Sequence, residues 1–269
     1  MKKTGPYVGI TGFMSLTEVV ACSNVFREAA QTAGEYVTAN LKFMIGVLVS
    51  SKTLTGGTNK WPGRYPTMAR IPGIISMKYQ DHLLYTIHYN TDDPITIDEQ
   101  VDQVINIAPS SINAIQLNIR WVNQVKLQRV KRKYPDLRII LQIGAGALAD
   151  VGELGEIFLG DALRAYEDVA DDFLVDPSGG KGEPIDVWRA FACIADDEIP
   201  SKMQPNIAGG FNADSVPMAR GLMRRLKRPV GLDAEGRLRN SDDSMNLEEA
   251  ARYLKGGVAL IGGVMVQYR

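Results

Sequence analysis

The chain has 269 residues, 45% of them hydrophobic, and 30 Lys and Arg balance 31 Asp and Glu for a formal net charge of −1. This balance gives no electrostatic reason to expect a nucleic-acid partner, and no apolar run is long enough to predict a membrane span. Two cysteines and two histidines, without a Cys-x-x-Cys, calcium-loop or P-loop motif, predict a reducing cytoplasm, no metal site and no cofactor.

Short β-type runs alternate with longer helical patterns along the whole chain. In the helical pattern over 15–33, Ser15 is placed to cap the helix together with Glu18. Further helical patterns cover 121–133, 156–169, 214–227 and 247–254. The predicted strands cover 7–11, 41–49, 83–89, 114–119, 137–143, 172–175, 206–208 and 230–232.

Eight strands, each followed by a helix or by a stretch long enough to hold one, predict parallel pairing with right-handed crossovers. Eight such units in about 250 residues are typical of an α/β protein with a (β/α)8 TIM barrel; a doubly wound open sheet is the alternative. Because no linker-like segment divides the chain, we predict one domain over residues 1–269. The long polar loop at 50–66 is expected at the active face or as a surface insertion.

Candidate chemistry lies where the predicted strands end, because barrels carry their active sites at that face. Strand six ends in Asp176, a carboxylate placed to act as a general acid or base. Glycine-rich turns after strands six, seven and eight let backbone N–H groups approach a phosphate closely. A helix beginning after strand seven would add its positive N-terminus. The predicted phosphate-binding residues in these turns are Gly179, Gly180, Lys181, Gly182, Gly209, Gly210, Gly236 and Arg237.

An ordered series of short motifs resembles phosphoribosylanthranilate isomerase, the Amadori-rearrangement enzyme of tryptophan synthesis. The resemblance spans most of the chain and is closest between Asp172 and Gly236. Its motifs are Gly9-Ile10-Thr11, Asn113-Ala114-Ile115-Gln116-Leu117-Asn118, Leu174-Val175-Asp176, Gly179-Gly180-Lys181-Gly182 with Ile185-Asp186, Ala208-Gly209-Gly210-Phe211-Asn212 and Gly231-Leu232-Asp233.

The resemblance implies roles for several of these residues. Asp176 takes the place of the family's general acid, which protonates the ribose ring oxygen as the furanose opens. Gly209 and Gly210, with the loop after Gly236, take the place of its phosphate site. Arg64, followed by a tyrosine, corresponds to the family's Arg-Tyr after strand two.

The sequence also departs from the family's pattern. Val8 stands where the family has its cysteine base, and valine cannot accept a proton. Asn118, a candidate substrate-binding residue together with Arg64, replaces a histidine, and Ala234 and Glu235 replace two serines. A carboxylate at Glu235 would repel a phosphate unless it points away or is paired, for which Arg237 is the nearest candidate.

Three residues are candidates for a relocated base or nucleophile. His88 lies late in strand three and could titrate near neutrality, although a packed histidine is the common alternative. Asp233 ends strand eight and could act across the barrel mouth from Asp176, or it could be structural. Lys52 could form a Schiff base if it were desolvated, but lysines in polar loops are usually solvated.

We therefore predict an isomerase of the intramolecular aldose–ketose type, acting by acid–base catalysis on a phosphorylated ribosyl or other sugar-phosphate substrate. The alternatives are a non-catalytic phospholigand-binding barrel, a Schiff-base lyase or aldolase using Lys52 or Lys181, and phosphoribosylanthranilate isomerase itself. The expected partner is a small phosphorylated substrate, with no nucleic acid and no membrane; homo-oligomerisation stays open.

Overall fold

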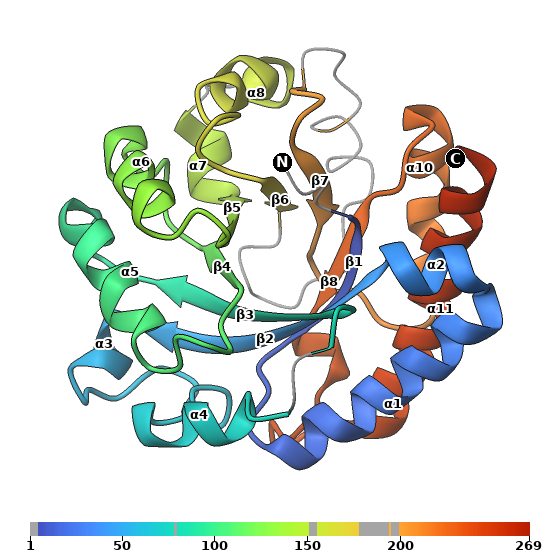
Figure 1. Cartoon of the computed structure of the whole chain (residues 1–269), viewed down its shortest axis with the longest axis horizontal. Helices are drawn as coiled ribbons and strands as arrows, with labels where there is room; N and C mark the ends of the chain where they lie inside the picture. Colours follow the sequence, from blue (N-terminus) through green and yellow to red (C-terminus); the bar gives the residue numbers. More distant parts are fainter. Residues whose placement is uncertain (1–4, 78–79, 151–154, 178–193, 195–198) are drawn as a thin grey trace.

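The computed structural model describes residues 5–77, 80–150, 155–177, 194 and 199–269. Eight parallel strands close into a barrel in sequence order, and β8 pairs back onto β1 (Figure 1). The predicted (β/α)8 barrel is therefore confirmed, and the open-sheet alternative is wrong. The strands are β1 (Tyr7–Thr11), β2 (Lys42–Ser50), β3 (Leu83–Asn90), β4 (Ala114–Leu117), β5 (Arg138–Gly144), β6 (Asp172–Asp176), β7 (Gln204–Ile207) and β8 (Gly231–Ala234).

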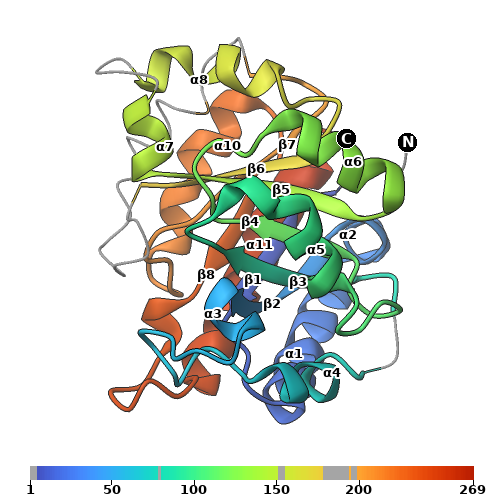
Figure 2. The same ribbon diagram turned by 90° about the vertical axis from the view of Figure 1, so that its left-hand side faces the viewer.

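Helices surround the barrel wall, as the side view shows (Figure 2). Short 3-10 turns lie at Met68–Arg70, Pro94–Thr96, Val216–Ala219 and Gly236–Leu238. The α-helices are α1 (Leu16–Ala33), α2 (Glu35–Asn40), α3 (Ser51–Leu54), α4 (Ile71–Ile74), α5 (Ile97–Ile105), α6 (Gln124–Lys133), α7 (Ala145–Asp150), α8 (Gly155–Arg164), α10 (Arg220–Leu226) and α11 (Leu247–Gln267).

The predicted cap of α1 is present. The Ser15 hydroxyl accepts from the Glu18 N–H at 3.2 Å, and the Glu18 carboxylate accepts from the Ser15 N–H at 3.0 Å. These two bonds satisfy backbone donors that the first helical turn would otherwise leave unpaired. Cys22 is buried within α1, as expected of a small packed side chain, whereas Cys193 lies outside the described residues.

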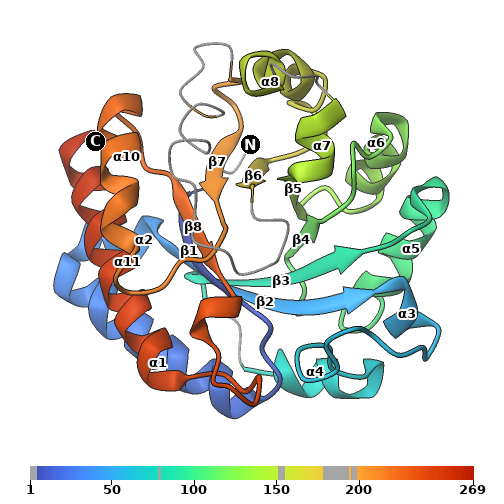
Figure 3. The same ribbon diagram turned by 180° about the vertical axis from the view of Figure 1, so that it is seen from behind.

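The last helix is much longer than predicted. We expected it to end near residue 254, but α11 continues to Gln267. Its second half is apolar and rich in glycine, so it lacks the amphipathic period by which a helix is recognised. The glycines instead allow close packing, because a Cβ atom at Gly257 would lie 2.9 Å from Val8 and one at Gly262 would lie 3.1 Å from Val37. Helix α11 thus lies directly against α1 and β1 (Figure 3).

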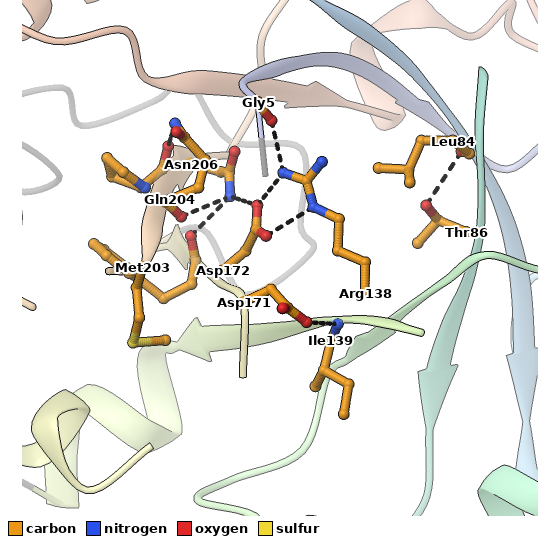
Figure 4. Close-up of polar contacts among 12 residues, drawn as sticks. Gly5, Leu84, Thr86, Arg138, Ile139, Asp171, Asp172, Met203, Gln204 and Asn206 are labelled. Carbon is orange, nitrogen blue, oxygen red and sulfur yellow. Dashed lines mark hydrogen bonds and ion pairs between the residues drawn. The ribbon is translucent and has the colours of Figure 1, made fainter. Parts of the chain in front are cut away.

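The inside of the barrel is layered. An apolar layer crosses it, made of Tyr7, Met44, Leu84, Ala114, Ile140, Leu174 and Ala208. At the amino-terminal end of the strands, Arg138 forms two hydrogen bonds with Asp172, at 2.6 and 2.8 Å, and donates to the carbonyl of Gly5 at 2.8 Å (Figure 4). Asn206 donates to the same carboxylate at 2.9 Å. This buried ion pair links β5, β6 and β7. The polar side chains of the candidate site lie at the opposite end of the barrel, at the carboxyl ends of the strands.

Candidate active site

A narrow cleft opens at the carboxyl ends of the strands, and its cavity volume is about 40 Å³. A water molecule needs roughly 10–15 Å³ of such space, so the cleft admits about three waters or one small chemical group. Six residues predicted from strand ends line it together, although they are far apart in the sequence. The lining residues are His88, Gln116, Gln142, Leu174, Asp176, Ala208, Gly209, Gly210, Asp233, Ala234, Glu235 and Gly236.

A chain of side-chain hydrogen bonds runs across the cleft floor from β6 to β3. Gln142 Nε2 donates to Asp176 Oδ2 at 3.0 Å, and Gln116 Nε2 donates to Gln142 Oε1 at 3.1 Å. Gln116 Nε2 also lies 3.2 Å from His88 Nδ1. The sequence did not predict a role for the two glutamines; the available signal was an amide at a buried position in an otherwise apolar strand.

His88 is held in its neutral form. Burial lowers its pKa to about 4, although the charge of Asp176 acts in the opposite direction. Because the amide of Gln116 donates to Nδ1, the remaining ring proton is on Nε2. A histidine with this pKa is a weak base at neutral pH.

Asp233 is a buried carboxyl group with an unusual proton affinity. Burial, followed by repulsion from Glu235 and Asp176, raises its pKa to about 7. Its two oxygens accept from the Thr11 hydroxyl at 3.1 and 3.3 Å. A Cβ atom at Gly9 would lie 3.1 Å from Asp233 Oδ1, so the glycine of β1 makes room for this carboxyl. The group therefore exchanges a proton near neutral pH.

Val8 does not face the cleft. Its side chain packs against Gly257 of α11 and belongs to the core between the barrel and its helices. The inward positions of β1 are those of Tyr7, Gly9 and Thr11, and the last two lie against Asp233. A cysteine at position 8 of this strand would therefore lie outside the barrel, so the base implied by the resemblance has no counterpart at this position.

The turn after β7 presents backbone donors to the cleft. Gly209 and Gly210 have φ angles of 114° and 71°, which are readily adopted only by glycine. Within the described part of the chain, their N–H groups donate to no other group. The predicted support from a helix N-terminus is wrong, however, because α10 begins only at Arg220, after a 3-10 turn.

Arg64 connects the loop after β2 to the loop after β8. Its guanidinium lies 2.9 Å from Glu235 Oε1 and 2.7 Å from Asp243 Oδ1, and both ion pairs are partly shielded from solvent. The acidic residue at the rim is therefore neutralised by Arg64, whereas Arg237 is exposed and does not line the cleft. The loop at 50–66 thus reaches the active face of the barrel.

The remaining predicted residues lie elsewhere. Asn118 donates its backbone N–H to the carbonyl of Tyr89 at 2.9 Å and does not line the cleft. Lys52 is exposed on α3 and is not desolvated as a Schiff-base lysine requires. Four residues fall outside the described part of the chain: Gly179, Gly180, Lys181 and Gly182.

No group of three or more His, Cys, Asp and Glu side chains in residues 5–77, 80–150, 155–177, 194 and 199–269 is arranged to hold a metal ion. Within the same ranges, the helices are too short or too polar to cross a membrane.

No protein-family model matches this chain, and no curated protein matches it in sequence. Solved structures with a similar fold include phosphoribosyl anthranilate isomerase from Thermococcus kodakaraensis, at 15% identity and a TM-score of 0.57 over 93% of this chain and 98% of that chain. A phosphoribosyl anthranilate isomerase in complex with reduced 1-(o-carboxyphenylamino)-1-deoxyribulose 5-phosphate has 15% identity and a TM-score of 0.59, over 95% of this chain and 100% of that chain.

Orotidine 5'-phosphate decarboxylase from Pyrococcus horikoshii OT3 is also similar, at 12% identity and a TM-score of 0.50 over 94% of this chain and 99% of that chain. At such identities the similarity establishes the fold. Enzymes with different reactions share that fold, so the reaction has to be argued from the residues of the cleft. The chain is a TIM barrel of the kind found in these enzymes.

Proposed function

We propose that the protein is an isomerase that moves protons within a small phosphorylated sugar, with Asp233 as general base and Asp176 as general acid. The observation that carries this proposal is the pair of buried carboxyl groups in one narrow cleft, at the ends of β6 and β8. Two carboxyls whose surroundings differ are a common basis for acid–base chemistry at neutral pH.

Asp233 suits the base because its pKa of about 7 makes its carboxylate a stronger base than an ordinary aspartate. In an aldose–ketose reaction it would carry the proton from C2 of the opened sugar to C1. Asp176, held by Gln142 at 3.0 Å, would protonate the ring oxygen as the ring opens. The resemblance noted in the sequence supports the same role for Asp176.

The phosphate would bind at the rim. The N–H groups of Gly209 and Gly210, which donate to none of the described residues, are suitable donors for phosphate oxygens. Glu235 lies nearby, but its pairing with Arg64 reduces the repulsion that an anion would meet there. The substrate would therefore place its anionic end at the turn after β7 and its reacting carbons between the two aspartates.

The test is solvent deuterium exchange with a panel of aldose phosphates, followed by NMR. The wild type should incorporate deuterium at C1 of a ketose product. Asp176→Asn and Asp233→Asn should each slow the reaction by about 10²–10⁴-fold, the usual contribution of a positioned acid or base. Asp171→Asn, at the opposite end of the barrel, is the control. Activity that survives both cleft substitutions would overturn the assignment, and phosphate binding without exchange would favour a non-catalytic barrel.

A further inference from the structure

The cleft lining is strongly acidic. It contains the carboxyl groups of Asp176, Asp233 and Glu235, and among the described residues that line it there is no lysine or arginine. Glu235 is neutralised by Arg64 from outside the lining. Asp233, in contrast, forms no ion pair within the described part of the chain; its carboxylate accepts from the Thr11 hydroxyl and interacts with the side-chain amide of Gln116. The cleft floor therefore holds a buried carboxyl that lacks a countercharge.

A second observation points to a missing donor at the same place. Gln116 is completely buried, and none of the described residues forms a hydrogen bond with its Oε1 atom. Its Nε2 atom is already used by Gln142 and His88. A buried acceptor without a donor destabilises a fold, so such atoms in native structures usually mark a ligand or an ordered water.

We propose that Asp233 and Gln116 form a seat for the ammonium group of a ligand. An ammonium group carries three N–H donors and one positive charge, which match a carboxylate and an amide oxygen. The cavity volume of about 40 Å³ is large enough to hold an ammonium group and small enough to enclose it closely. An anion would be repelled at this depth, so a phosphate is confined to the rim at Gly209 and Gly210.

This inference refines the proposed function by naming the substrate class. Together, the amide donors at the rim and the ammonium seat on the floor select a phosphorylated amine, such as an amino sugar phosphate. The inference rests on the proposed function only for the phosphate end. Binding of the ammonium also favours the ionised form of Asp233.

Proton release on binding gives the seat a distinctive signature. The ionisable groups that face Asp233 include Asp176, Glu235 and the two tyrosines Tyr7 and Tyr253. Burial raises the pKa of both tyrosines well above 10, so they stay neutral. A ligand ammonium should therefore expel a proton chiefly from Asp233, about half a proton per site at pH 7.

The test is isothermal titration calorimetry of the full chain with three probes: phosphoethanolamine, glycerol 3-phosphate, which lacks the amine, and ethanolamine, which lacks the phosphate. Phosphoethanolamine should bind at least about tenfold more tightly than glycerol 3-phosphate, as expected for one charge-assisted hydrogen bond. Titration in buffers of different ionisation enthalpy should show the proton release. Asp233→Asn and Gln116→Leu should each reduce the preference, and Asp171→Asn should retain it.

Each outcome bears on the seat or on the phosphate site. Equal affinity for the two phosphate probes, or a preference that survives Asp233→Asn, would overturn the ammonium seat and leave the proposed function standing. Binding of ethanolamine with no contribution from phosphate would support the seat and contradict the phosphorylated substrate. The absence of heat with all three probes at millimolar concentration would overturn both.

Discussion

Replacing Asp233 by Asn should stabilise the fold, and the gain should depend on pH. The carboxyl is buried, and burial is the main reason for which its pKa rises from 3.8 to about 7. Each pKa unit corresponds to about 1.36 kcal/mol, so this rise corresponds to about 4 kcal/mol. Asparagine has nearly the same shape and carries no charge to be buried.

The direction in which the stability difference between Asp233→Asn and the wild type changes with pH follows from proton linkage. Well below pH 3.8, Asp233 is protonated in both the folded and the unfolded chain, so it does not alter the pH dependence of stability there. Between about pH 4 and pH 7 the unfolded chain loses the proton first, and the folded state becomes progressively less stable. The free energy of unfolding of Asp233→Asn should therefore differ least from that of the wild type near pH 4. At pH 8 it should exceed the wild-type value by up to about 4 kcal/mol.

The assay is urea denaturation of both proteins at pH 4, 5, 6, 7 and 8, with Asp171→Asn as a control carboxyl that is partly exposed and paired with Lys131. The control should show no comparable gain with rising pH. A stability difference that is constant over this range would refute the linkage argument. Lower stability of Asp233→Asn at pH 8 would show that the hydrogen bond from Thr11 outweighs the cost of the buried charge.

Three further predictions concern the ion pairs and the histidine. Asp172→Asn leaves the Arg138 guanidinium buried without its countercharge, so it should destabilise the protein by about 3–5 kcal/mol in urea denaturation; a loss below 1 kcal/mol would contradict this. Arg64→Ala should lower stability by about 1 kcal/mol more than Arg237→Ala at low salt, because the Arg64 ion pairs are partly shielded. A comparable loss in both variants would count against the assigned pairing. NMR should find His88 neutral at pH 6 with its proton on Nε2, and a charged ring there would refute the burial argument.

The sequence predicted the barrel well because strand identity depends on local pattern. Runs of apolar and β-branched residues recur eight times, and the closed order of parallel strands follows from the helices between them. Element boundaries were less predictable. Strand β7 begins at Gln204 rather than 206, because Pro205 near the start of a strand is tolerated although it lacks an N–H.

The sequence predicted only those residues of the site whose place at the end of a strand is enough to bring them to the cleft. Asp176 lies at the end of β6 and Asp233 at the end of β8, with only β7 between these two strands. The fold itself therefore brings the two carboxyl groups to one cleft. The roles of Gln116 and Gln142 depend on which face of a strand each side chain occupies, and a short buried strand does not reveal this in its sequence. The pairing of Arg64 with Glu235 joins residues far apart in the chain, and no local pattern encodes it.

The apolar layer across the barrel has a consequence for how the molecule can be altered. Seven side chains, from Tyr7 to Ala208, separate the ion pair of Arg138 and Asp172 from the titrating carboxyl of Asp233. Neither charge of that ion pair is among the main causes of the raised proton affinity of Asp233. The amino-terminal end of the barrel can therefore be re-engineered for higher thermal stability without altering the chemistry of the cleft. Conversely, the residues that line the cleft can be varied without disturbing the ion pair of Arg138 and Asp172.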